Sequence, residues 1–222
     1  MVMSRSIKGL MVKDFQLMRS QMKFYFIVMM LWGVVMASSL NMVFFAGYNA
    51  LICSFLLVST FSYDAFENGY AYLFTLPVSR RDYIYEKYMF GFLLTTFPFL
   101  LVSAVCWAAL VIRDSGMHFG VYCLSVSTAL PMAYLMLALE IPLQIKFGQE
   151  KSRIVSMLLI GGMSAAMGLI GFLSESVGVA EVLSGIAGFG IGGVAVLVAA
   201  VVVVLLMVSY RISCRIMEKK EF

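Results

Sequence analysis

The residue types that most often carry catalysis are few and scattered in this sequence. The single histidine, His118, has no neighbouring carboxylate pair or cysteine with which to hold a metal or activate a nucleophile. The four cysteines (Cys53, Cys106, Cys123, Cys214) lack the spacing of a metal site or of a disulfide framework. No glycine-rich phosphate-binding loop ending in Gly-Lys-Ser or Gly-Lys-Thr is present. We therefore expect no enzyme activity and no bound cofactor in this chain.

Polar residues inside long apolar runs are the remaining candidates for chemistry. Buried membrane carboxylates are costly and often functional, so Glu140 is one candidate. The interpretation that we favour is that Glu140 reaches the interface and pairs with a nearby Lys or Arg. Pro98 and Pro131 interrupt backbone bonding within their runs, and interrupted helices often mark a transport path, although many membrane prolines are inert. The candidate path comprises Thr95, Thr96, Pro98, Ser127, Thr128, Pro131 and Glu140.

Composition and charge patterning indicate the elements that carry these residues. Apolar residues make up 62% of the 222 residues and charged residues 13%, about half the charged share of a soluble domain. Fifteen of the sixteen Lys and Arg residues lie in four short stretches between apolar runs. Short basic loops stay on the cytoplasmic side. This pattern predicts an all-α membrane protein with six transmembrane helices and both termini cytoplasmic.

The apolar runs place the six predicted spans in one membrane domain, residues 1–222, with no room for a soluble domain. The spans cover about 24–40, 44–63, 89–112, 119–142, 154–172 and 185–210. The net charge of +4 sits at membrane edges, where it orients the chain and attracts anionic lipid heads. We therefore expect the lipid bilayer as a partner and no nucleic acid.

The segment before the first span, residues 4–22, is too polar to cross a membrane. At 100° per residue, Ile7, Met11, Phe15, Met18 and Met22 share one face, and basic residues lie opposite. This pattern predicts an amphipathic helix that lies in the inner interface. A solvated helix packed on a partner protein is the alternative.

The cytoplasmic region 64–87 is long and aromatic. Phe66, Tyr70, Leu73 and Phe74 have the spacing of one helix face, and Pro77 ends that helix. The apolar face either binds a partner or packs on the membrane interface, and both interpretations stay open.

The residues after Pro77 indicate where the next helix begins. Ser79 followed by Asp82 is typical of an N-cap that opens a helix feeding the third span. The second cytoplasmic segment, 142–153, is expected to be a compact loop with charges of both signs.

Two segments resemble a known family. "TLPVSRRDYIYEKY" (75–88) and "IPLQIKFGQEKSR" (141–153) are similar to the permease subunits of type-2 ABC exporters, in particular a compact bacterial subfamily linked to peptide and antibiotic export. The resemblance implies a permease domain with an N-terminal elbow helix and six spans in a bacterial plasma membrane. It also implies a second permease, identical or paralogous, and two separate ATPase subunits that bind ATP and Mg²⁺. The cargo would be an amphipathic peptide or a lipophilic compound moved out of the cell.

The resemblance also implies which residues touch the ATPase. A coupling helix from about Glu67 to Phe74 would press its apolar face into a groove of the partner, and the 146–153 segment would form a smaller contact. The implied contact residues are Glu67, Tyr70, Leu73, Phe74, Thr75, Leu76, Pro77, Lys146, Phe147, Gly148, Glu150, Lys151 and Arg153. A membrane-bound immunity or scaffold protein that binds an ATPase without transport is the alternative.

Overall fold

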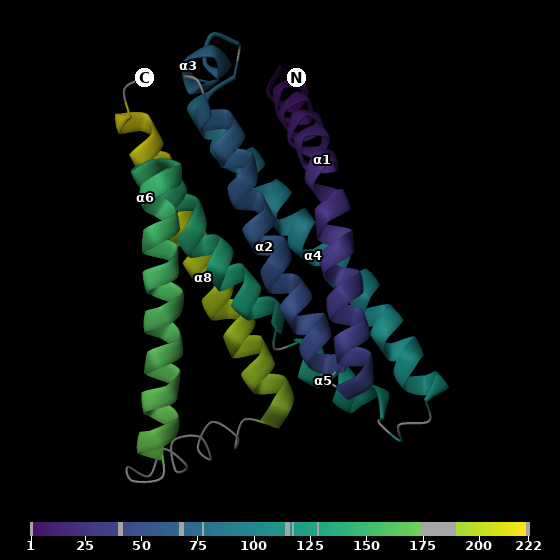
Figure 1. Ribbon diagram of the computed structural model, residues 1–222. Coiled ribbons are helices and arrows are strands. Elements are labelled where there is room, and N and C mark those ends of the chain that lie inside the picture. Colours follow the sequence, from purple (N-terminus) through teal and green to yellow (C-terminus); the bar gives the residue numbers. More distant parts are fainter. Residues whose placement is uncertain are drawn as a thin grey trace.

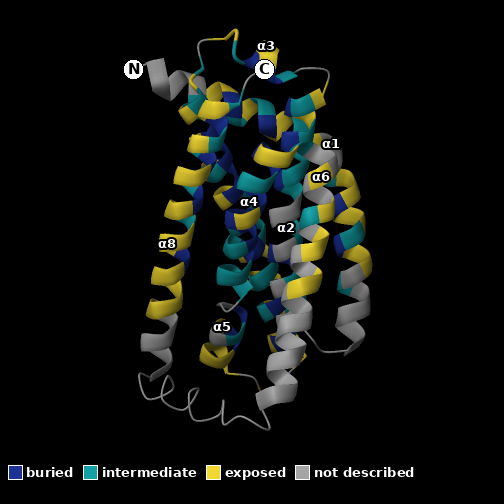
Figure 2. Cartoon of the chain, turned by 90° about the vertical axis from the view of Figure 1, so that its left-hand side faces the viewer, coloured by how far each residue is buried: buried dark blue, intermediate teal, exposed yellow. Residues whose placement is uncertain are grey.

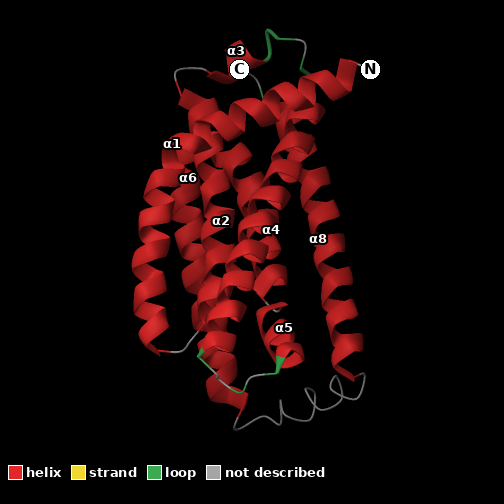
Figure 3. Ribbon diagram, turned by 90° about the vertical axis from the view of Figure 1, so that its right-hand side faces the viewer, coloured by secondary structure: helices red, strands yellow, loops and turns green. Residues whose placement is uncertain are grey.

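The chain forms a bundle of long helices in a computed structural model, which describes residues 2–39, 42–66, 69–76, 78–113, 116, 118–127, 129–174 and 190–220 (Figure 1). The helices are α1 (Val2–Ser39), α2 (Met42–Ala65), α3 (Gly69–Leu73), α4 (Arg80–Ile112), α5 (Phe119–Ser127), α6 (Ala129–Ser174) and α8 (Gly190–Lys219). The described residues contain no strand, as Figure 3 shows. The predicted all-α class is therefore confirmed.

Three segments of the described chain are long and apolar enough to cross a membrane. They are Arg80–Ile112, Ala129–Gly148 and Val196–Lys219, and they overlap the predicted spans 89–112, 119–142 and 185–210. The predicted spans 44–63 and 154–172 lie within helices α2 and α6. The count of six spans stays a prediction.

Helix α1 joins the predicted amphipathic arm and the first span in one continuous helix. Figure 3 shows it crossing the top of the bundle from the N-terminus and then descending along its side. The buried face of the arm carries Leu10, Asp14 and Met18, whereas Phe15 is exposed. Residues 4–22 are therefore helical, and of the predicted apolar face Met18 is buried and Met22 is partly buried, whereas Phe15 is exposed and Asp14 is turned toward the core by its ion pair with Lys87. The position of this face at the membrane interface stays a prediction.

The fourth predicted span is divided between two helices. Helix α5 ends at Ser127 and α6 begins at Ala129, and Thr128 between them lies outside the described residues. Pro131 occupies the first turn of α6, where a helix needs no N–H donor. Pro98, in contrast, lies inside the continuous helix α4, so no helix interruption occurs there.

Helix α6 contains a chain reversal in place of the predicted loop at 142–153. Gly148 has φ 72° and ψ −178°, and helical residues flank it on both sides. A φ of this sign suits glycine, which has no Cβ. Gly148 alone therefore reverses the chain where a loop was expected. Figure 1 shows the two halves of α6 meeting at this turn.

Helices α2, α4 and α6 form the centre of the bundle. A Cβ at Gly91 of α4 would lie 2.8 Å from Leu57 Cδ2 of α2 and 3.3 Å from Leu137 Cδ2 of α6. The three helices thus approach closely around one glycine. Helix α8 flanks this centre and is exposed along most of its described length (Figure 2).

Candidate functional site

The start of α1, helix α3 and the end of α8 lie together at one end of the bundle, here called the α3 end (Figures 1 and 2). Helix α3 leaves α2 through Gly69, where a Cβ would lie 2.7 Å from the backbone oxygen of Asp64. A larger residue would push α3 off the end of α2. The sequence thus holds the short helix directly against the bundle.

The inner face of α3 belongs to the core of the chain itself. Tyr70 and Leu73 are buried and Phe74 is half-buried. The rings of Phe61, Tyr70 and Phe74 all meet the Tyr83 ring edge to face, with centroids 6.0–6.3 Å apart. In the described chain Tyr70 and Leu73 thus face the core, because Tyr83 of α4 supplies an internal partner for that face. Their contact with an ATPase stays a prediction.

The outer side of the segment carries a different apolar set. Phe66, Tyr72 and Leu76 are 68%, 72% and 45% exposed. A turn follows α3, since the Thr75 hydroxyl donates to the Tyr72 carbonyl at 2.7 Å and the Leu76 N–H donates to the Leu73 carbonyl at 3.3 Å. Glu67 and Pro77 lie outside the described residues.

The N-cap of the next helix is also as predicted. Ser79 is the N-cap of α4, and its hydroxyl accepts a hydrogen bond from the Asp82 N–H at 3.1 Å. This cap fixes the start of α4 only a few residues after α3. It therefore sets the position of the Tyr83 ring under α3.

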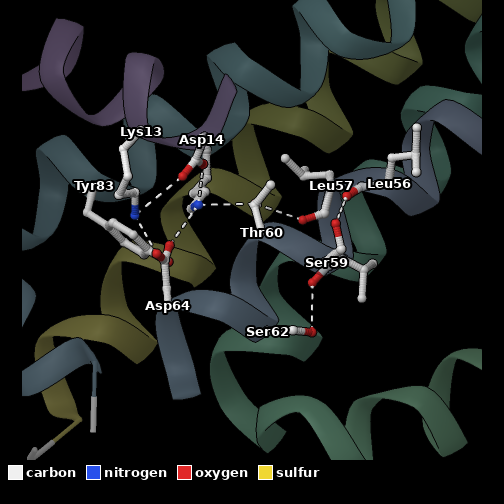
Figure 4. A network of polar contacts seen from close by, with 11 residues as sticks. Lys13, Asp14, Leu56, Leu57, Ser59, Thr60, Ser62, Asp64 and Tyr83 are labelled. Atoms are coloured by element: carbon white, nitrogen blue, oxygen red, sulfur yellow. Dashed lines mark hydrogen bonds and ion pairs between the residues drawn. The ribbon is translucent and has the colours of Figure 1, made fainter. Parts of the chain in front are cut away.

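Below α3 lies an ionic cluster formed by Lys13 and Asp14 of α1, Asp64 of α2 and Lys87 of α4 (Figure 4). Lys87 is fully buried, pairs with Asp14 and lies 2.8 Å from Asp64 Oδ2. It also donates to Thr60 Oγ1 at 3.1 Å, and Tyr83 Oη donates to Asp64 Oδ2 at 2.9 Å. Lys13 pairs with both carboxylates.

The four residues of the ionic cluster carry two cations and two carboxylates. Glu86, the buried neighbour of Lys87, adds a third acid whose oxygens have no partner among the described residues. Buried charges of this kind are stable only when they are paired and hydrogen-bonded. Burial alone would raise the pKa of Asp64, but the charges of Lys87 and Lys13 outweigh burial and hold it below its ordinary value. The cluster leaves no local pattern in the sequence, because Lys87 and its partner Asp14 are 73 residues apart.

The C-terminal end of α8 is fastened to the start of α4. The Arg80 guanidinium donates from Nη1 to the carbonyl oxygens of Met217, Glu218 and Lys220, each at 2.9 Å. The last carbonyls of a helix have no partner within the helix and carry partial negative charge. Arg80 satisfies these groups, and Arg81 adds an ion pair with Glu218 at 2.8 Å.

Lys220 connects α3 with the reversal in α6. Its ammonium donates to the Ile145 carbonyl at 3.0 Å and lies 5.2 Å from the centre of the Tyr70 ring. Ile145 belongs to the last turn before Gly148, where carbonyls lose their helical donors. Burial lowers the pKa of Lys220. One side chain therefore brings the two predicted contact segments together.

The second predicted contact segment is partly exposed at this same end. Lys146 and Lys151 are exposed, and the Lys146 ammonium lies 5.1 Å from the centre of the Phe147 ring, which is itself exposed. Gly148 makes the chain reversal. The side chains of Glu150 and Arg153 lie outside the described part of the structure.

The candidate path residues whose side chains the structure describes lie on α4 and α6, and none of the hydrogen bonds in the described chain joins one of them to another. Thr96 shares hydrogen bonds with the Phe92 carbonyl and with Tyr134 Oη, whereas Thr95 Oγ1 is buried without a partner among the described residues. Pro98 and Pro131 are half-buried. The Ser127 side chain and Thr128 lie outside the description.

Glu140 is buried rather than interfacial. It is 3% exposed, and neither carboxylate oxygen has a hydrogen-bond partner among the residues that the structure describes. The favoured interpretation of an interfacial ion pair is therefore wrong for the described chain. Glu140 shares a helix face with the buried Ala133, Met136 and Gln144, and this face turns away from the solvent.

The comparison with protein families identifies the class of protein. A family model described as "ABC-2 family transporter protein" matches residues 9–218. The chain therefore belongs to the ABC-2 transporter family, and its apolar helices fit a membrane-integral permease. The searches of curated proteins and of solved structures gave no match.

Proposed function

We propose that this chain is the transmembrane subunit of an ATP-driven exporter, and that separate ATPase subunits bind and hydrolyse the ATP with Mg²⁺. Proteins of this family usually partner with ABC ATPases. In this proposal the chain itself carries no catalytic residue. It crosses the membrane six times, and the α3 end faces the cytoplasm.

The observation that carries the proposal is the exposed apolar set on the outer side of the α3 segment, Phe66, Tyr72 and Leu76. Large apolar side chains that cluster outside a membrane span mark a surface for a protein partner. The inner face of the segment is packed on Tyr83, so a partner would press on a fixed surface. Lys146, Phe147 and Lys151 would widen the contact.

The contacts beneath α3 offer a route for motion. Tyr83 joins α3 to α4, the ionic cluster joins α4 to α1 and α2, and Arg80 and Lys220 join the end of α8 to α4 and α6. A displacement of α3 by the ATPases would therefore shift the ends of several spans at once. ATP binding would then change the populations of inward-open and outward-open states.

The complex that we propose contains two permeases, identical or paralogous, and two ATPases in a bacterial plasma membrane. The cargo would be an amphipathic peptide or a lipophilic compound. Thr95, Thr96 and Glu140 remain candidates for the path through the membrane, since two of them carry polar atoms without partners in the described chain.

The partner surface is tested by purifying the chain together with its ATPase and measuring ATP hydrolysis in lipid. Tyr72→Asp and Leu76→Asp should reduce both copurification and hydrolysis, because each puts a charge on the exposed apolar surface. Tyr72→Phe is the matched control and should retain both, since the ring remains. If both Asp variants retain full copurification with the ATPase, this surface is not the contact.

Transport needs a separate measurement. Inside-out vesicles that contain the permease and the ATPase should accumulate a cargo peptide only when ATP is supplied. Copurification and ATP hydrolysis without flux of any tested cargo would favour a scaffold or immunity role over export.

A further inference from the structure

A lateral groove opens between α4, α6 and α8, on the side of the bundle away from α1. Its volume is about 440 Å³, within the range of small-ligand pockets, which is ~300–1,000 Å³. Four tyrosines contribute to its walls, Tyr85, Tyr88, Tyr134 and Tyr210. The three helices that form the groove are the same three whose described segments are apolar enough to span a membrane. The groove therefore lies between helices that are expected to cross a bilayer.

The tyrosine hydroxyls do not make the groove polar. Tyr88 Oη lies 2.6 Å from Ser209 Oγ and 3.0 Å from Ser213 Oγ, and Tyr134 Oη lies 2.7 Å from Thr96 Oγ1. These bonds hold the hydroxyls against neighbouring helices and leave ring faces toward the groove, where Phe92 stacks on Tyr134 at 5.4 Å. A groove of this kind excludes water and suits a hydrocarbon chain.

Charges at the α3 end of the groove complement a different chemical group. Arg81 lies one helical turn before Tyr85 on the same face of α4, and its side chain is mostly exposed. Arg211 follows Tyr210, and Arg215 lies one turn further along α8; both are exposed. Arg81 is paired with Glu218 and has Asp82 beside it, so the excess positive charge at this end comes from Arg211 and Arg215 of α8. Tyrosines at an interface next to basic residues are typical of the headgroup level of a membrane.

From this arrangement we propose that the groove binds one anionic phospholipid of the leaflet on the α3 side. One acyl chain fills the groove between α4 and α8, and the phosphate lies at the rim beside Arg81. The lipid stays bound when the bulk bilayer is removed. This site is separate from the partner surface on the outer side of α3 and does not depend on the proposed transport activity.

The acyl-chain half of the proposal is tested by filling the groove. The full-length chain is reconstituted in vesicles of phosphatidylglycerol and phosphatidylcholine, purified in detergent, and its retained lipids are counted by mass spectrometry. Val203→Trp places an indole in the groove and should abolish retention of phosphatidylglycerol. Val201→Trp, on the opposite face of α8, is the matched control and should retain it. Met207→Trp provides a second groove-filling variant if Val203→Trp does not fold.

The headgroup half is tested by removing a charge. Arg81→Gln should lower the preference for phosphatidylglycerol over phosphatidylcholine about fivefold, the effect of one basic residue near an anionic lipid. Glu218→Gln also breaks the Arg81–Glu218 ion pair but leaves the cation free. It should keep or increase the preference, which separates lipid binding from loss of the ion pair.

Two results would overturn the proposal. One is equal retention of phosphatidylglycerol by the Val203→Trp, Met207→Trp and Val201→Trp variants, since the groove would then hold no particular lipid. The other is disulfide cross-linking of two Val203→Cys chains in vesicles. A second copy of the permease, and not a lipid, would then cover the groove.

Discussion

The ionic cluster at the α3 end and the Glu140 carboxyl group in the middle of the bundle treat buried charges in opposite ways. At the α3 end, Lys87 is fully buried and contacts two carboxylates, one hydroxyl and two aromatic rings. In the middle, Glu140 is almost as deeply buried, and neither of its oxygens has a partner among the described residues. The ionic cluster and Glu140 therefore differ in the pairing of their charges more than in their burial. Glu86, next to Lys87 on α4, resembles Glu140, since it is buried and neither of its oxygens has a partner among the described residues.

This difference indicates what each region is built to do. Paired charges with one arrangement fix the relative positions of α1, α2 and α4, so the α3 end can move as a unit. A lone buried carboxylate costs stability and is kept in membrane proteins mostly where it acts on a proton, ion or cargo. The four predictions that follow test this contrast, from the largest expected effect to the smallest.

Loss of the central lysine should have the largest effect. Lys87→Met removes the fully buried cation and leaves only the partly buried Lys13 to pair with Asp14 and Asp64, and breaking a buried pair in this way costs about 3–5 kcal/mol. The measurement is the midpoint of thermal unfolding in detergent. Lys13→Met is the matched control, since Lys13 is only partly buried and should cost clearly less. Equal losses for the two variants would contradict a special role for Lys87.

The fastening of α8 should contribute the next largest effect. Arg80→Met removes a charged donor from three carbonyls at the end of α8, and a hydrogen bond to a charged group contributes about 1.5–3 kcal/mol. Hydrogen exchange should then increase in the last turns of α8 while the rest of the helix changes little. Arg80→Lys keeps the charge without the planar fork and should recover part of the protection. Unchanged exchange in Arg80→Met would show that the end of α8 is held by packing alone.

Replacement of the isolated carboxylate, Glu140, should raise stability, in contrast to the loss expected for the Lys87 and Arg80 variants. Glu140→Leu replaces an unpaired buried acid by an apolar side chain and should stabilise the protein by about 1 kcal/mol. Glu140→Gln should gain less, because its amide still needs hydrogen-bond partners. Unfolding in detergent measures both variants. A clear loss of stability in Glu140→Leu would mean that this acid is paired after all.

The smallest expected effect is the pH dependence of the stability that Asp64 contributes. The pKa of Asp64 is lowered in the folded chain, so its carboxylate stabilises the fold at pH values above the ordinary pKa of ~3.9. That contribution is lost as the pH falls through the lower pKa of the folded state. The stability difference between the wild type and Asp64→Asn should therefore stay constant from pH 7 to about pH 5 and shrink below ~4. A stability difference that increases as the pH falls would mean that the pKa of Asp64 is raised, and not lowered, in the folded chain.

The elements that depend on neighbouring residues were predictable from the sequence. The Ser79–Asp82 pattern located the start of α4 because an N-cap is a local hydrogen bond. The apolar runs predicted α2, α4 and much of α8 because length and hydropathy are sufficient for a membrane helix. The two loop motifs also indicated the right family, which the match over residues 9–218 confirmed.

The features that the sequence did not predict depend on distant contacts. Periodicity placed Tyr70 and Leu73 on an apolar face, but it could not tell whether Tyr83 or a partner protein covers that face. Lys87 contributed only to the predicted orientation of the chain in the membrane. Its pairing with Asp14, 73 positions away, leaves no local pattern in the sequence. The sequence predicts a loop around Gly148 because the charged residues that flank it are also common in loops.

The reversal at Gly148 has a consequence for how force travels through the protein. The two antiparallel halves of α6 are joined by the single residue Gly148, with no flexible loop between them. A shift of one half along its axis is therefore passed directly to the other half. Lys220 binds the Ile145 carbonyl in the first half of α6, just before Gly148. A movement at the end of α8 would therefore be passed to α6 next to the reversal. A short flexible insert of glycine and serine after Gly148 would leave both halves of α6 helical but would allow each half to move without the other.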